Sequence, residues 1–181
     1  MADSTTLALK RILPTLNRSS IPHVIIGGLA SGVLGRPRVT LDIDILVGGG
    51  STGLLRLASL IEKKGGERVK SFLEMNPMLR GTMIQIQLGP ILVDIMRSRD
   101  LHDRVTLRRR RKVKAFGTRI FLPKAEDLIL LKMKVGRDRD LSDCIGIFEA
   151  QKESLDLKYL WRWAFRLRLL DEYHYVVGTK Q

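Results

Sequence analysis

The sequence predicts an α/β (α+β) fold in which helices flank a mixed β-sheet and a helical C-terminal part follows. Short apolar segments rich in β-branched residues alternate with segments of helical periodicity, which is the order expected when helices cover a sheet. After Pro123 the apolar residues recur at helical spacing. A chain of 181 residues, of which 44% are hydrophobic, suffices for one packed unit.

We divide the chain into a sheet-bearing part, residues 1–122, and a helical part, residues 123–181, packed together as a single compact unit. In the first part, helices are expected at 5–18, at a short segment from residue 29 and at 52–64. Strands are expected at 23–26, 41–47, 69–72, 83–88, 91–95 and 119–122.

The last helix is expected over residues 157–170. Spacing of i, i+3 and i+4 predicts a core-facing side made of Leu157, Leu160, Trp161, Ala164 and Phe165. Trp163 falls outside this side, near Arg162 and Arg166. Ordinary surface exposure and stacking against a nucleic-acid base are the two interpretations of Trp163.

Two carboxylates lie on the strand predicted at 41–47. Asp42 and Asp44 share one face, because side chains at i and i+2 of a strand point to the same side. Neighbouring carboxylates repel each other unless a cation lies between them, and oxygen ligands suit Mg²⁺ or Mn²⁺. The alternative is that both acids simply occupy the solvent face of an amphipathic strand.

Asp94 is a third acid, inside the apolar strand predicted at 91–95. An unpaired carboxylate in such a strand is costly. If this strand lies beside the strand of Asp42 and Asp44, the three acids converge as ligands for two metal ions. Asp94 is then also the candidate general base.

Gly27 and Gly28 follow the first predicted strand and precede a short helix. Glycine permits positive φ and close approach of the backbone to a ligand. The amides and positive dipole end of the helix suit phosphate oxygens. The alternative is an ordinary strand-to-helix turn.

The order of these motifs resembles the nucleotidyltransferase superfamily (DNA polymerase beta-like), whose pattern is an apolar residue, Gly, Gly or Ser, a spacer, and then Asp-apolar-Asp or Glu. Gly27-Gly28 and Asp42-Ile43-Asp44 match this pattern, and Asp94 suits the later acid. Residues 38–44 are also similar to the Arg-x-Thr-x-Asp-apolar-Asp signature of the small AbiEii/AbiGii toxin-related branch.

The resemblance implies a mixed sheet with flanking helices and nucleotide binding that includes Arg38 and Thr40. It further implies that Lys132 contacts the nucleotide phosphates and that Asp140 and Asp143 support the site. From the residues alone, Lys132 could instead be a solvated lysine, and Asp140 could be an N-cap of a helix over residues 141–148.

The charge is strongly positive, with 32 Lys and Arg against 19 Asp and Glu and a formal net charge of +13. This balance favours a polyanionic partner, with RNA as the expected acceptor, and argues against the superfamily branch that adenylylates cationic aminoglycosides.

The arginine run within residues 104–114 is expected to form a strand pair near the site. Contact with an RNA backbone and a solvated hairpin face are its two interpretations. The candidate contacts are Arg108, Arg109, Arg110 and Arg111.

The sequence therefore predicts a magnesium-dependent enzyme that moves an NMP from an NTP to a hydroxyl acceptor, most simply RNA, as the toxin of a toxin/antitoxin pair. Two alternatives remain open. One is a catalytically degenerate protein that binds nucleic acid or an antitoxin partner, and the other is transfer to a protein or small molecule. No apolar run spans a bilayer and the first residues lack a signal-peptide pattern, so we expect no membrane partner and a cytoplasmic location.

Overall fold

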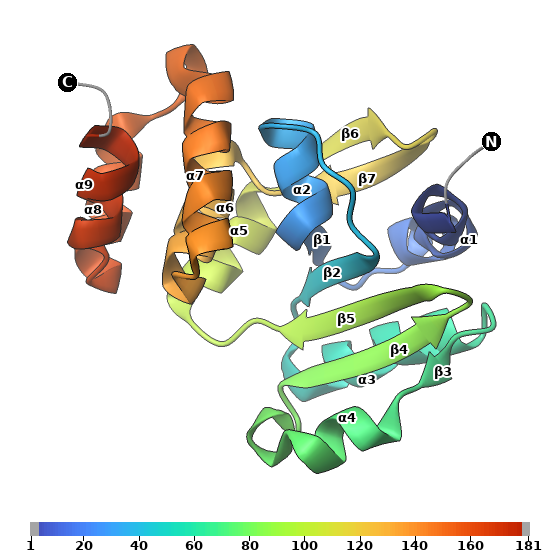
Figure 1. Cartoon of the computed structure of the whole chain (residues 1–181). Coiled ribbons are helices and arrows are strands. Elements are labelled where there is room, and N and C mark those ends of the chain that lie inside the picture. Colours follow the sequence, from blue (N-terminus) through green and yellow to red (C-terminus); the bar gives the residue numbers. More distant parts are fainter. Residues whose placement is uncertain (1–3, 179–181) are drawn as a thin grey trace.

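The computed structural model describes residues 4–178, without the side chains of residues 71–73. A five-stranded mixed sheet forms its centre, with strand order β1-β2-β5-β4-β3, and a two-stranded sheet, β6-β7, lies beside it. Helices lie on both sides of the five-stranded sheet (Figure 1). The strands are β1 (His23–Ile26), β2 (Asp42–Val47), β3 (Glu67–Arg68), β4 (Met83–Leu88), β5 (Ile91–Arg97), β6 (Arg111–Ala115) and β7 (Thr118–Leu122).

The helices of the sheet-bearing part are α1 (Ser4–Arg18), α2 (Gly27–Leu34), α3 (Gly50–Glu62), α4 (Lys70–Met75) and α5 (Leu101–Arg109), with a short 3-10 turn at Pro77–Leu79. The helices of the C-terminal part are α6 (Ala125–Val135), α7 (Asp138–Gln151), α8 (Leu157–Leu167) and α9 (Leu170–Gly178), with a 3-10 turn at Lys152–Ser154. None of the helices within residues 4–178 is long and apolar enough to cross a membrane.

One face of the five-stranded sheet is the core. Ile43, Ile45, Val93 and Ile95 alternate with polar or partly exposed residues along β2 and β5, and all four are fully buried. Helices α1 and α3 pack on this face, and Leu57 of α3 is fully buried there. The alternation leaves the opposite face of β2 and β5 to the acidic side chains.

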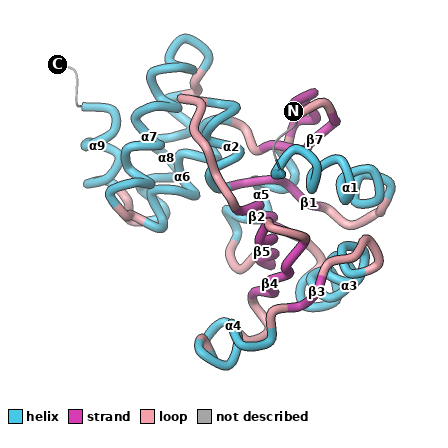
Figure 2. The backbone as a smooth tube through the Cα atoms, turned by 45° about the vertical axis from the view of Figure 1, so that its right-hand side comes forward, coloured by secondary structure: helices cyan, strands magenta, loops and turns pink. Residues whose placement is uncertain are grey.

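The opposite face carries α2 and α5 near β1, and the C-terminal helices pack around α2 (Figure 2). On this side Val24 and Leu46 pack with Leu107 of α5 in a small apolar cluster. On this face Asp44 and Asp94 are half-buried and Asp42 is exposed. The acids of β2 and β5 therefore lie on a face that is only partly covered.

A single hydrophobic core extends across residue 122. Leu122 of β7, Leu128 of α6 and Leu160 of α8 belong to the same buried cluster as the core residues of the sheet. This continuity supports our proposal that residues 1–122 and 123–181 form one compact unit.

Two predicted elements in the sheet-bearing part are wrong. The strand expected at 69–72 falls on helix α4, and β3 is limited to Glu67–Arg68. The spacing of Val69 and Phe72 fits one face of a helix as well as an extended segment, so the pattern does not discriminate. In the arginine run, residues up to Arg109 are helical in α5, and only β6 forms the expected strand pair with β7.

The predicted core-facing side of the last helix is right for Leu160 and Ala164, which are buried, and wrong for the other three residues and for Trp163. Trp161 and Phe165 are 45% and 59% exposed, and Leu157 is 42% exposed, whereas Trp163 is buried. The helix packs with Tyr159, Leu160, Trp163 and Ala164 inward. The helix has two apolar sides, one with Trp161 and one with Trp163. The side with Trp163 is buried, and its ring contacts the buried ring of His102 on α5, with 5.0 Å between centroids.

We predict that Trp163→Ala lowers the free energy of unfolding by about 3 kcal/mol, because it opens a cavity between α5 and α8. Trp161→Ala should change it by less than about 1 kcal/mol, since the ring is half exposed. Chemical denaturation of the two variants measures this difference. The reverse order would contradict the inward orientation of Trp163.

Candidate active site

Asp44 and Asp94 are direct neighbours across the parallel pair β2 and β5. Gln85 of β4 lies opposite Asp94 on the other side, and its amide donates to Asp94 Oδ1 at 2.8 Å. Asp42 lies two residues before Asp44 on the same face and is exposed. The parallel pairing thus brings together the three acids that the sequence placed on two separate strands.

Gly27 is the contact point between α2 and the acids. It has φ +63°, and a Cβ at this position would overlap the carboxylate of Asp44. Ile26 pairs with Asp44 across β1 and β2, so the first amides of α2 begin directly beside this carboxylate. Only glycine combines this positive φ with this close approach.

The environment raises the pKa of Asp44 to about 7. Burial is the main cause, followed by the negative charges of Asp42 and Asp94, while the positive charges of Lys132 and Arg137 act in the opposite direction. The pKa of Asp94 is also raised, chiefly by burial, although the hydrogen bond from Gln85 opposes the shift. The acids therefore form a cluster whose negative charge is not balanced by the protein.

Arg38 and Thr40 lie on the loop between α2 and β2 and frame the glycine pair. A Cβ at Gly28 would lie 2.9 Å from both Arg38 Nη2 and Thr40 Oγ1. The Thr40 hydroxyl donates to Asp42, and Arg38 donates through Nε and Nη2 to both carboxylate oxygens of Asp143, at 3.2 and 3.1 Å. The loop is thereby tied to β2 at one point and to α7 at another.

Lys132 is buried and pairs with both predicted supporting acids. Its ammonium lies 3.1 Å from Asp140 Oδ1 and 2.7 Å from Asp143 Oδ2. Arg137 donates to the second oxygen of Asp140 at 2.7 Å, and these cations lower the pKa of Asp140. The N-cap of α7 is Arg137, so Asp140 lies within the helix and is not the N-cap considered from the sequence.

The sequence reasoning missed Gln85 and Arg137. Gln85 is partly exposed at an alternating position of β4, where it looks like an ordinary residue of an amphipathic strand. Arg137 stands in a run of alternating Arg and Asp, so its sequence context did not distinguish it. The register between β4 and β5 and the turn between α6 and α7 bring these residues to the site.

The donor set fits a hard divalent cation that arrives with phosphate groups. Asp42 and Asp44 on β2 and Asp94 on β5 share one face of the sheet, and after burial the charges of Asp42 and Asp94 contribute to the raised pKa of Asp44. Within the described residues, no group of three or more His, Cys, Asp or Glu side chains is placed so that it could hold a metal ion. Asp42 is engaged with Thr40 and Asp94 with Gln85. Mg²⁺ commonly takes one or two carboxylates and completes its shell with substrate phosphates and water.

Two cavities lie on either side of the acids along the strand direction. One, of about 320 Å³, lies before Asp42 and is lined by Arg38, Thr40 and Phe116 among others. The other, of about 210 Å³, lies beyond Asp44 and Asp94 and includes Leu46 and Met96 in its lining. Residues next to the acids line both cavities, but Asp42, Asp44 and Asp94 themselves line neither.

The four arginines predicted to contact nucleic acid divide into two pairs. Arg109 donates to Asp127 Oδ2 at 2.8 Å and stacks 3.8 Å over the ring of Tyr159, so it holds the interior together. Arg110 donates to the carbonyl of Leu107 and lies against the ring of Phe121. Arg108 and Arg111 are exposed and stay candidates for that contact.

No protein-family model matches the chain, and no curated protein matches it either. Among solved structures, the fold is similar to the antibiotic-resistance factor ANT(2'')-Ia in complex with adenylyl-2''-tobramycin, with a TM-score of 0.63, 15% identity and coverage of 92% of this chain and 98% of that chain. It is also similar to the lincosamide antibiotic adenylyltransferase LnuA bound to lincomycin, with a TM-score of 0.53, 12% identity and coverage of 81% and 96%.

A further similar structure is an antigenic nucleotidyltransferase-like protein from Paracoccidioides brasiliensis, with a TM-score of 0.52, 18% identity and coverage of 95% of this chain and 89% of that chain. Likeness at these identities establishes the fold. The chain therefore has the mixed-sheet fold of nucleotidyltransferases, as the sequence predicted. The assignment to the AbiEii/AbiGii toxin-related branch stays a prediction.

We predict that Asp44→Asn stabilises the protein at pH 8 by about 2 kcal/mol, after allowance for solvent screening. Because the folded-state pKa of Asp44 is raised to about 7, the folded protein holds a proton that the unfolded chain releases near pH 4. The contribution of Asp44 to stability therefore falls as pH rises from about 4 to 7. Denaturant unfolding of wild type and Asp44→Asn at pH 5 and pH 8 measures this. A stability difference independent of pH would contradict the charge cluster.

We predict that Gly27→Ala destabilises the fold more than Gly89→Ala does. Both glycines have nearly the same positive φ, +63° and +60°, so both substitutions introduce similar backbone strain of about 1 kcal/mol. At Gly89 no atom lies within 4 Å of the added Cβ, whereas at Gly27 the methyl group displaces the Asp44 carboxylate. Thermal unfolding compares the two variants, and equal losses would argue against the contact between α2 and Asp44.

Proposed function

We propose that this protein is a magnesium-dependent nucleotidyltransferase that moves an NMP from an NTP to a hydroxyl group of RNA. One observation carries the proposal: Asp44 and Asp94 are paired on β2 and β5, and the α2 N-terminus at Gly27 begins against Asp44. This arrangement combines a site for divalent cations with a helix end that suits phosphate groups. The fold it shares with adenylyltransferases is consistent with this chemistry.

In this proposal Asp42, Asp44 and Asp94 hold Mg²⁺, or Mn²⁺, which supplies charge neutralisation at the phosphates. The amides at the start of α2 receive phosphate oxygens of the NTP, and Gly27 and Gly28 keep the space beside them free of side chains. Phosphoryl transfer depends mainly on positioning and electrostatics, so these fixed groups supply most of what the protein contributes.

Asp94 is suited to act as general base. Its Oδ1 accepts from Gln85, which leaves Oδ2 to take the proton of the attacking hydroxyl, and its raised pKa favours that transfer. The hydroxyl oxygen forms a bond to the α-phosphorus, the bond from that phosphorus to the bridging oxygen breaks, and pyrophosphate leaves.

Lys132 acts on the site through its ion pair with Asp143 and through its positive charge. Through Asp143 it holds Arg38 of the loop, and its charge lowers the pKa of Asp44. We propose that Arg38 and Thr40 bind the nucleotide from this loop, which their hydrogen bonds to Asp143 and Asp42 hold in place. A direct contact of Lys132 with phosphate, as the resemblance implies, would require its ammonium to leave Asp140 or Asp143.

RNA is the acceptor that the overall charge supports, since a net charge of +13 attracts a polyanion. Exposed Arg108 and Arg111 add to this field. A toxin role with an antitoxin partner, and a cytoplasmic location where NTPs and RNA are available, belong to the same proposal. The second candidate is transfer to a small molecule, which the likeness in fold to antibiotic adenylyltransferases favours.

We predict that calorimetric titration of wild type with each of the four NTPs and Mg²⁺ detects binding, and that Asp42→Asn/Asp44→Asn abolishes it. The charge-neutral change removes two proposed metal ligands without removing volume. Asp94→Asn leaves the proposed ligands Asp42 and Asp44 in place, so it should weaken NTP binding less than the double variant does, but it should lower transfer of labelled NMP by about 100-fold or more, as expected for loss of a general base.

Asp171→Asn, on exposed α9, serves as the control and should behave as wild type. Labelled NMP offered with total RNA and, separately, with aminoglycosides and lincosamides identifies the acceptor class. NTP binding that survives in the double variant would overturn the assignment of the metal ligands. Binding without transfer to any acceptor would indicate the degenerate alternative.

A further inference from the structure

The exposed face of α8 is an apolar and basic surface that the proposed reaction does not use. Two parallel stripes run along it, each with a spacing of four residues and therefore about 6 Å per step. All six side chains are exposed, and the stripes consist of Leu157, Trp161 and Phe165, and of Lys158, Arg162 and Arg166.

The aromatic pair is arranged as a platform. The rings of Trp161 and Phe165 are stacked, with 5.7 Å between centroids and an interplanar angle of 15°, although they are 45% and 59% exposed. A surface depression of about 540 Å³ lies beside them and is lined by Leu157, Trp161 and Arg162 among others. Exposed, ordered rings next to a hollow are typical of a binding surface.

The charged side chains of α8 itself are all basic, although Asp156, just before the helix, also lines the depression. Helix α8 contains no acidic residue, and Asp156, which precedes it, uses its carboxylate to accept the amide of Tyr159 as the N-cap. The guanidinium of Arg166 lies over the ring of Trp163, with 5.6 Å between its carbon and the ring centroid.

The neighbouring helix α5 also carries exposed cations. This helix packs against α8 through the ring contact between His102 and Trp163 and through Arg109 over Tyr159. Its exposed face carries Arg104 and Arg108. Arg104 and Arg108 lie on the side of α5 opposite to His102 and Arg109, so they do not extend the surface formed by α8.

We propose that the exposed face of α8 binds single-stranded nucleic acid, with unpaired bases stacked on Trp161 and Phe165 and phosphates at Lys158, Arg162 and Arg166. Bases and phosphates of a single strand repeat in step with each other, as the two stripes do. Aromatic rings in a basic setting bind single strands with little dependence on sequence.

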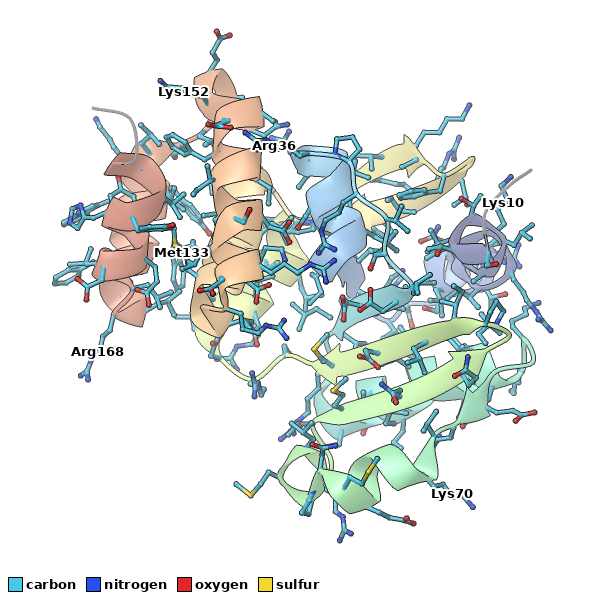
Figure 3. All side chains as sticks on the ribbon, viewed as in Figure 1. Lys10, Arg36, Lys70, Met133, Lys152 and Arg168 are labelled. Carbon is cyan, nitrogen blue, oxygen red and sulfur yellow. The ribbon has the colours of Figure 1, made fainter. Side chains whose placement is uncertain are left out.

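A second copy of the chain fits this surface poorly, because a symmetric contact would bring Lys158, Arg162 and Arg166 against the same three cations. An acidic protein helix would satisfy the charges of α8, but it offers no unpaired base to stack on the rings of Trp161 and Phe165. A single-stranded polynucleotide supplies both phosphates for the cations and bases for the rings. Figure 3 shows Arg168, just after α8, pointing outward from the C-terminal helices on the side away from the sheet. The surface is thus separate from the acids of β2 and β5.

The test is fluorescence anisotropy with a short labelled single-stranded oligoadenylate, in the absence of NTP and divalent cations, so that the result does not depend on the proposed nucleotidyl transfer. Trp161→Ala and Phe165→Ala should each weaken binding about tenfold or more through loss of base stacking. Arg162→Ala should reduce the slope of binding against salt by about one. Tyr175→Ala, which removes a 54% exposed ring from α9, is the matched control and should bind as wild type.

Circular dichroism and thermal unfolding establish that each variant is folded before binding is compared. Wild-type affinity retained in both ring variants would overturn the proposal, as would equal affinity for the matching duplex, which cannot offer unpaired bases. Displacement of the oligonucleotide by polyglutamate at equal charge concentration would also overturn it, because an acidic protein would then be the better occupant.

Discussion

The parallel pairing of β2 with β5 is the constraint on which the candidate site depends. It places Asp44 beside Asp94 at the separation of adjacent strands, about 4.8 Å between backbones. Neither carboxylate can move away, because the alternate residues of both strands are locked in the core. The features around them reduce the resulting electrostatic cost: the raised pKa of Asp44, the amide of Gln85 on Asp94 and the start of α2 at Gly27. A bound cation would complete this compensation.

A chain of alternating charges connects this acidic face to the C-terminal helices. Arg38, Asp143, Lys132, Asp140 and Arg137 form successive ion pairs, with Lys132 buried at the centre. Each acid in this series is held by two cations, and removal of the buried Lys132 would take one partner from both acids at once. This series of ion pairs joins the loop before β2 to α6 and α7. It therefore fixes the position of the helical part relative to the loop that frames the proposed nucleotide site.

The distribution of charge differs sharply between this interior and the surface. The chain carries a net charge of +13, yet its one partly covered sheet face gathers three acids. In the proposed function, the outer surface would attract a polyanionic acceptor, and cations brought with the nucleotide would let it approach the acids. The arginine run shows that basic residues adjacent in the sequence need not all be available to bind a partner. Arg109 is used internally by Asp127 and Tyr159, and only part of the run faces solvent.

The sequence by itself determined the strands that carry the acids, the glycine pair before α2 and the type of chemistry these residues favour, because local periodicity and residue type decide them. It did not determine which side of α8 is buried, since Trp161 and Trp163 offer two competing apolar stripes and only the ring of His102 on α5 selects between them. It also did not reveal Gln85 or Arg137, which reach the acids through strand register and a helix turn. Tertiary structure decided these points because each depends on a partner distant in sequence.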